Sequence, residues 1–138
     1  MRITSTVLTL GVALLTGACT DLPYAPVKYT GGLMTDTNGR ALYTFDKDVA
    51  GSGKSVCNGP CATNWPPFTA AAGDKPGGDW TIVTRDDGGR QWAWLGKPLY
   101  FYAKDLQPGE ITGDGFNNAW RVVKPEPRPM TGNMSLGP

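Results

Sequence analysis

The sequence contains no histidine, the residue that most often acts as a general base near neutral pH or binds a metal ion. Its absence excludes Ser-His and Cys-His catalysis, and we expect no enzyme activity. There are three cysteines, too few for a structural zinc or iron–sulfur site, which needs about four Cys or His ligands. We therefore expect neither a cofactor nor a metal.

The chain also has very little net charge (+1), because 13 Lys and Arg residues are nearly balanced by 12 Asp and Glu residues. Without a net field it has nothing to attract a nucleic acid, and we expect no such partner. Gly (19) and Pro (12) are frequent, which predicts many turns and few helices. The five Trp, five Tyr and four Phe provide large rings for a small core.

The first 18 residues are typical of a signal peptide. Arg2 precedes an apolar stretch, residues 7–15, that is too short to span a bilayer. Small residues then lead to Cys19, as in the lipobox of bacterial lipoproteins, although Thr16 stands where that pattern prefers Leu. We predict a signal peptide at 1–18, acylation of Cys19 (palmitate among the chains) and a tether over 19–29. The alternative is a secreted protein with a free Cys19.

The other two cysteines, Cys57 and Cys61, flank a short turn sequence. In an oxidising compartment such a pair forms a structural disulfide. A redox-active pair is the alternative, but the spacing differs from the familiar Cys-x-x-Cys motif.

One pattern occurs twice: Leu-Tyr-x-aromatic-x-Lys-Asp, at residues 42–48 and 99–105. On a strand, the Tyr and the second aromatic residue share one face while Leu lies on the other. In each copy the Asp is followed by a Gly-containing loop and then a Trp. The repeat-motif residues are Tyr43, Phe45, Asp48, Tyr100, Tyr102 and Asp105.

The duplication predicts an all-β domain, 30–124, of two similar β-meander repeats at 30–68 and 80–124. Neither half has enough apolar surface to fold alone, so both should share one core as a small sandwich or barrel. We expect strands near 33–35 and 41–45 around an Asn38-Gly39 turn, and again near 80–84, 91–95, 99–102 and 119–123. The tail, 125–138, is predicted to be disordered.

Several side chains are candidates for binding a metal ion or a ligand. Asp48 and Asp105 could bind calcium, but we favour hydrogen bonds to backbone N–H groups of the loops that they open. Met130 and Met134 could bind copper(I), although no His supports such a site. The candidate binding surface is aromatic, and burial of its rings in the core is the competing interpretation; its residues are Trp65, Trp92, Trp94 and Trp120.

The chain resembles a family of secreted bacterial repeat proteins, mostly predicted lipoproteins, that carry a Tyr-x-aromatic-x-x-Asp motif. The motif stands here at 43–48 and 100–105, and the run from Cys57 to Pro67 and the Arg85-Asp86-Asp87-Gly88 segment also match in order and spacing. The resemblance implies an envelope location and a repeat fold, and it supplies no catalytic residue.

Together these features predict a non-catalytic lipoprotein of the bacterial cell envelope that faces the periplasm or the exterior. It would be held on a membrane by its lipid anchor and would bind an unidentified envelope protein or ligand. The alternative is an accessory role in extracytoplasmic electron transfer or metal handling.

Overall fold

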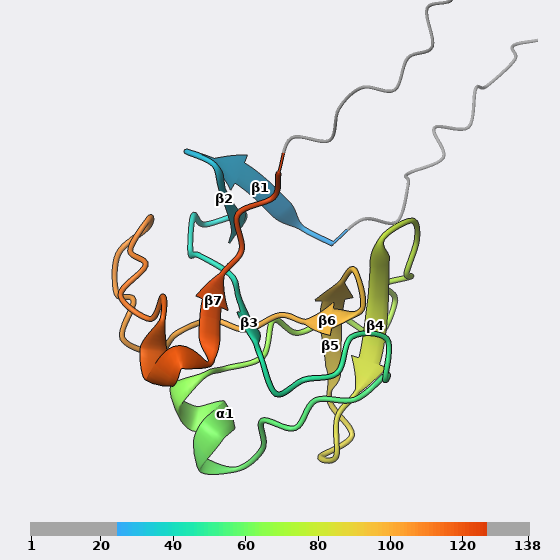
Figure 1. The fold of residues 1–138 in the computed structure, drawn as a ribbon. Helices are drawn as coiled ribbons and strands as arrows, with labels where there is room; N and C mark the ends of the chain where they lie inside the picture. The colour runs from blue at the N-terminus through green and yellow to red at the C-terminus, as the bar shows by residue number, and fades with distance from the viewer. Residues whose placement is uncertain (1–24, 127–138) are drawn as a thin grey trace, which may run out of the picture.

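The computed structural model describes residues 25–126, so the predictions for the signal peptide, for Cys19 and for all but the first two residues of the tail lie outside the described residues. The described part is built mostly of short strands, which confirms the all-β class (Figure 1). The strands are β1 (Val27–Thr30), β2 (Leu33–Asp36), β3 (Tyr43–Phe45), β4 (Trp80–Thr84), β5 (Arg90–Trp94), β6 (Lys97–Pro98) and β7 (Trp120–Val122). They are accompanied by a helix of one turn, α1 (Pro60–Asn64), and a 3-10 turn, η1 (Phe116–Asn118).

The strands form three small antiparallel sheets, ordered β1-β2, β3-β7 and β4-β5-β6. The β3–β7 sheet joins the two repeats, since Tyr43 pairs with Val122 and Phe45 with Trp120. The last strand of the second repeat therefore lies along the motif of the first (Figure 1).

The two motifs meet at Tyr43 and Tyr100, which exchange both of their backbone hydrogen bonds, at 2.8 and 2.9 Å. Further bonds join the two repeats around this point in equivalent pairs. Val123 N donates to Leu42 O (2.8 Å) as Phe68 N does to Leu99 O (2.9 Å), and Met34 N donates to Val123 O (3.0 Å) as Trp92 N does to Phe68 O (2.8 Å). The two copies thus occupy equivalent places in one domain.

The interior holds two clusters of apolar side chains, and each draws on both repeats. Tyr43 and Tyr100 are fully buried in one cluster, and Leu42 and Leu99 in the other. The alternation of the motif between two faces is therefore confirmed, and so is the shared interior.

The first strand corrects the predicted tether, because Val27 already begins β1, which pairs with β2. Gly31 and Gly32 make the turn between them, both with positive φ (58° and 78°) that suits glycine. The Asn38-Gly39 turn is also present, closed by the Thr35–Ala41 bridge. Prolines before residue 27 suggested a tether, but the β-forming residues Val27 and Tyr29 continue the sheet.

The motif of the second repeat forms less regular strand than expected. β6 ends at Pro98, and Tyr100 makes isolated bridges to Tyr43 and to Pro67. Because Pro66 has no N–H group, its carbonyl accepts from Phe101 N (2.8 Å) but its nitrogen cannot donate in return, so the ladder on that side is incomplete.

The helix α1 was not anticipated, yet its limits follow from the sequence. Pro60 stands at its first position, where proline is favoured. Trp65 lies outside it (φ −126°, ψ 74°), since a residue before proline is pushed away from helical geometry.

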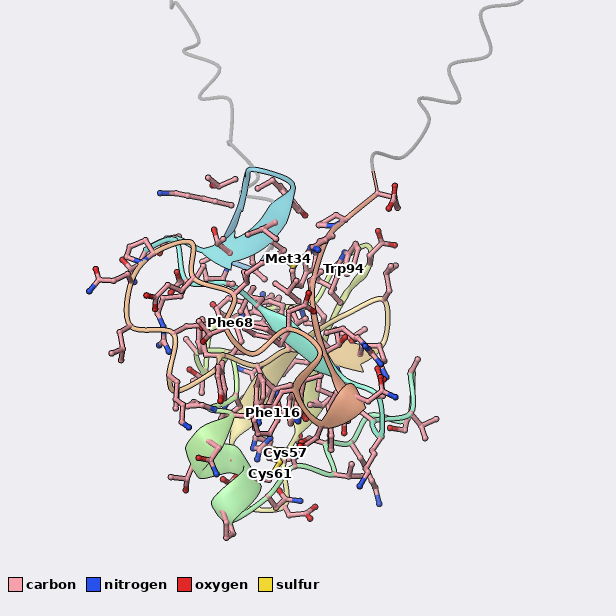
Figure 2. The ribbon with its side chains drawn as sticks, turned by 60° about the vertical axis from the view of Figure 1, so that its left-hand side comes forward. Met34, Cys57, Cys61, Phe68, Trp94 and Phe116 are labelled. Carbon is pink, nitrogen blue, oxygen red and sulfur yellow. A yellow bond between two sulfur atoms is a disulfide. The ribbon has the colours of Figure 1, made fainter. Side chains whose placement is uncertain are left out.

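Both ends of the described chain, Ala25 and Glu126, lie at one end of the domain, near β1 (Figures 1 and 2). The helix α1 and the turn η1 lie at the opposite end (Figures 1 and 2).

Candidate functional site

The motif tyrosines and aspartates form two crossed pairs between the repeats. The Tyr43 hydroxyl donates to Asp105 Oδ2 (2.6 Å), and the Tyr100 hydroxyl donates to Asp48 Oδ2 (2.5 Å). Burial, with the hydrogen bond to Asp adding to it, raises the pKa of each tyrosine well above its ordinary value of 10.0. Both tyrosines therefore stay protonated, as donors, across the physiological range.

The second oxygen of each aspartate binds the backbone of the loop that follows it. Asp48 Oδ1 accepts from Val56 N (2.8 Å), and Asp105 Oδ1 accepts from Thr112 N (2.9 Å). Both aspartate side chains are buried, and each connects the loop that follows it to a tyrosine of the other repeat. No group of three His, Cys, Asp or Glu residues within 25–126 is placed to hold a metal ion.

Four of the aromatic rings at the repeat junction stack face to face. Trp65 and Trp120 lie at the centre, with ring centroids 3.8 Å apart and planes within 2°. Tyr102 stacks on the outer face of Trp65 and Phe45 on that of Trp120, each at 4.2 Å. Each pair contributes about 0.5–1.5 kcal/mol beyond simple burial, so the stack is a rigid unit made jointly by both repeats.

A disulfide on one side and a closely packed glycine on the other hold Trp65 in the stack. The Cys57–Cys61 disulfide, predicted from the sequence, is confirmed, and it fixes α1 immediately before Trp65. On the other side, Gly113 packs so closely that a Cβ there would stand 2.6 Å from the Trp65 ring. Only glycine fits at this position of the loop.

A pocket of about 380 Å³ opens over the stack, within the range typical of small-molecule sites. Its ring-bearing residues are Phe45, Trp65, Tyr102, Phe116 and Trp120. Phe116 of η1 is 42% exposed and stands 5.9 Å from the Trp65 centroid, at the edge of the pocket. The lining thus combines a rigid floor with one accessible ring.

The polar side chains of the pocket are basic or neutral: Lys47, Asn64, Lys104 and Asn117. Among its lining residues, all within the described part of the chain, there is no Asp or Glu. Lys47 and Lys104 are the lysines of the two motif copies. Their presence in both motif copies was visible in the sequence, but the sequence did not lead us to expect them at a binding site.

The four tryptophans of the predicted binding surface do not form one surface. Trp65 and Trp120, each 3% exposed, are buried together beneath the pocket, whereas the buried Trp92 and the half-buried Trp94 of β5 belong to the other cluster. Trp92 and Trp94 are two residues apart on β5, so their rings lie on the same face, against the second cluster. The prediction that they share one surface with Trp65 was therefore wrong.

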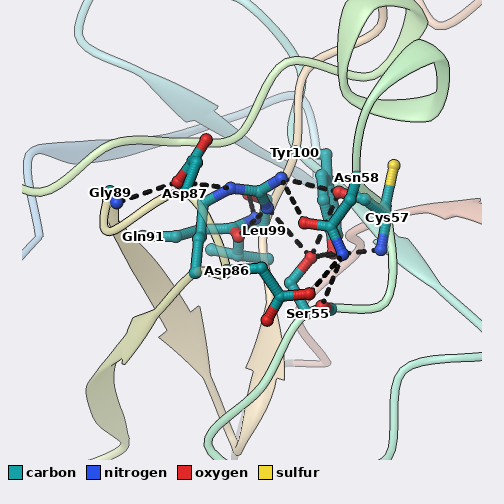
Figure 3. Close-up of polar contacts among 10 residues, drawn as sticks. Ser55, Cys57, Asn58, Asp86, Asp87, Gly89, Gln91, Leu99 and Tyr100 are labelled. Carbon is teal, nitrogen blue, oxygen red and sulfur yellow. Dashed lines mark hydrogen bonds and ion pairs between the residues drawn. The ribbon is translucent and has the colours of Figure 1, made fainter.

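A second polar cluster links the β4–β5 turn to the disulfide loop (Figure 3). Arg85, only 4% exposed, donates to Ser55 Oγ (2.9 Å), Gln91 Oε1 (2.7 Å) and the Cys57 carbonyl (2.6 Å). Ser55 in turn lies 2.7 Å from the Tyr100 hydroxyl. The network therefore braces the Tyr100–Asp48 pair and is closed to ligands by burial.

None of the helices within residues 25–126 has the length and apolar character needed to cross a membrane.

A family model described as a secreted repeat of unknown function matches the chain twice, over residues 27–69 and 81–124. No curated protein and no solved structure matches the chain. The two matched segments correspond to the two halves that meet at Tyr43 and Tyr100.

Proposed function

Because this chain belongs to the family of secreted repeats of unknown function and works outside the cytoplasm, we propose that it is a non-catalytic binding protein whose ligand occupies the pocket between its repeats. The observation that carries this proposal is that both repeats supply the rings of one pocket, with Phe116 left 42% exposed at its edge. Phe116 thus adds open apolar surface to a concave site whose other rings are buried, and a mostly apolar lining with a few polar groups is typical of small-molecule sites.

The chemistry of the lining supports binding rather than catalysis. It offers ring edges, two amides and two ammonium groups, and no paired carboxylates of the kind that glycoside hydrolysis requires. The motif aspartates are already engaged with tyrosines and loop N–H groups. Nothing in the described residues favours the accessory role in electron transfer or metal handling, which stays a prediction.

We further propose that acylated Cys19 anchors the protein to a membrane of the bacterial cell envelope. The described chain begins at the end of the domain away from α1 and η1 (Figure 2). An anchor that precedes Ala25 would therefore leave the pocket directed away from the lipid surface, where an envelope protein or a small ligand could reach it.

The test is a ligand screen by NMR on isotope-labelled protein, with the indole N–H signals of Trp65 and Trp120 as reporters. Ligands that bind the pocket should shift these signals, and Phe116→Ala should weaken binding about tenfold because a stacking or edge contact is lost. Tyr29→Ala is the matched control, since Tyr29 is 61% exposed on β1 and away from the pocket. Equal loss in both variants, or ligands that shift only other signals, would contradict the proposed site.

A further inference from the structure

Taking the pocket as the binding site proposed above, we propose that its ligand is a flat ring carrying an anionic group, a carboxylate or a phosphate, which Lys47 and Lys104 hold. The rings of the stack would contact the ring of the ligand, and the two ammonium groups would pair with its charge.

The two lysines occupy equivalent places. Each is the sixth residue of the repeated seven-residue motif, two positions after the ring that ends the stack, Phe45 or Tyr102. Both line the same pocket. The duplication therefore brings one cation from each repeat to a single cavity.

Neither lysine has a hydrogen bond or an ion pair with any residue of the described range, 25–126. The neighbouring acids are already engaged: Asp46 pairs with Arg121 at 3.1 Å, and Asp48 and Asp105 are buried in their bonds to tyrosine.

Lys97 shows the contrast, because its ammonium group donates to the carbonyls of Phe45 (2.9 Å) and Asp48 (2.6 Å). That lysine has a structural role in the fold. The two motif lysines have their donors available for a ligand.

The rings alone would favour an anion only weakly, because both faces of Trp65 and of Trp120 are covered within the stack and only the slightly positive ring edges are open. The lysines supply the main preference for an anion, since an anion would gain two charge-assisted hydrogen bonds and a cation would meet like charge. No acidic residue of the lining offsets them, although the chain as a whole carries almost no net charge.

The competing interpretation is that both lysines merely cover the rings with their methylene stems and keep their charges in water. The two interpretations differ in what a charged probe does. We would titrate the protein by NMR with two anions, 2-naphthoate and 2-naphthyl phosphate, with the neutral 2-naphthamide and with the cation 2-naphthylmethylammonium.

We expect both anions to shift the Trp65 and Trp120 indole signals. They should bind about tenfold more tightly than 2-naphthamide, because each exposed ion pair with a lysine raises the affinity by roughly fivefold or less. The cation should bind most weakly. The advantage of the anions should shrink between about 0.01 M and 1 M salt, as the screening length falls from ~30 to ~3 Å.

The variant Lys47→Gln/Lys104→Gln should remove the preference for anions, weakening both anions much more than 2-naphthamide, and Lys47→Arg/Lys104→Arg should keep the preference. Lys75→Gln is the control, because Lys75 is exposed and lies outside the pocket. Equal binding of all four probes, or an anion preference that survives the double Gln variant, would overturn the assignment of the lysines and leave the pocket itself standing. Failure of every probe to shift the Trp65 and Trp120 signals would overturn the proposed function as well.

Discussion

The crossed hydrogen bonds between Tyr100 and Asp48, and between Tyr43 and Asp105, make a prediction that is specific to this fold. Each tyrosine should depend on the aspartate of the other repeat, not on the aspartate of its own. A double-mutant cycle measures this dependence directly, since it isolates the interaction between two side chains from their separate effects.

The expected size follows from the contacts. In Tyr100→Phe the Oδ2 of Asp48, in a side chain that is 2% exposed, loses its donor at 2.5 Å and retains only the Val56 N–H on Oδ1. Hydrogen bonds to a charged group contribute about 1.5–3 kcal/mol. The variant should therefore lose about 2–3 kcal/mol of unfolding free energy, a large part of the 5–15 kcal/mol typical of a domain.

The assay is urea unfolding followed by tryptophan fluorescence, for the single and double variants of three residue pairs. The Tyr100–Asp48 and Tyr43–Asp105 cycles, with Phe and Asn replacements, should each give a coupling of about 1.5–2 kcal/mol. The Tyr43–Asp48 cycle, whose residues belong to one repeat, should give less than about 0.5 kcal/mol. Coupling within a repeat as large as coupling across repeats would refute the crossed arrangement.

Three other perturbations have defined outcomes. Since both tyrosines have a folded-state pKa raised above 10.0, the stability that they contribute should be constant below pH 10 and fall as the pH rises above it; thermal unfolding of Tyr43→Phe/Tyr100→Phe should show a shallower alkaline decline than that of the wild type. Replacing Cys57 and Cys61 by Ser should cost roughly 2 kcal/mol of unfolding free energy, because the closed loop is short, and a loss near zero in urea unfolding would show that the hydrogen bonds of Asp48 and Arg85 hold the loop without the disulfide. Cells fed radiolabelled palmitate should label the protein, and Cys19→Ser should abolish the label and release the protein from membranes; label that persists in Cys19→Ser would rule out the anchor.

Much of the local structure was accessible from the sequence, because it depends on short-range rules. The hairpin formed by β4 and β5 follows from β-branched and aromatic residues around Asp87-Gly88-Gly89. The disulfide follows from proximity in the chain. The placement of Tyr43 and Leu42 in different clusters follows from the two-residue period of a strand.

The irregular parts were harder to predict. β1 was missed because prolines nearby suggested a tether, whereas the pairing of Val27 with Asp36 depends on a turn at Gly31-Gly32. The inward position of Arg85 has no local signal, since its partners Ser55 and Cys57 are distant in the chain. A buried cation is found only where the surrounding carbonyls and hydroxyls have been assembled.

The sequence by itself determined the absence of His-based chemistry, the duplication, the pairing of the cysteines and the two faces of each motif strand. It could not say which aspartate each tyrosine binds, because the two motifs are nearly the same and either partner satisfies the local pattern. The antiparallel meeting of Tyr43 with Tyr100 and the pairing of β3 with β7 decide that choice, and the same contacts stack Trp65 on Trp120 and bring Lys47 and Lys104 to one pocket. The physical reason is that strand period and loop closure act over a few residues, whereas a site shared by two repeats exists only after their long-range pairing has formed.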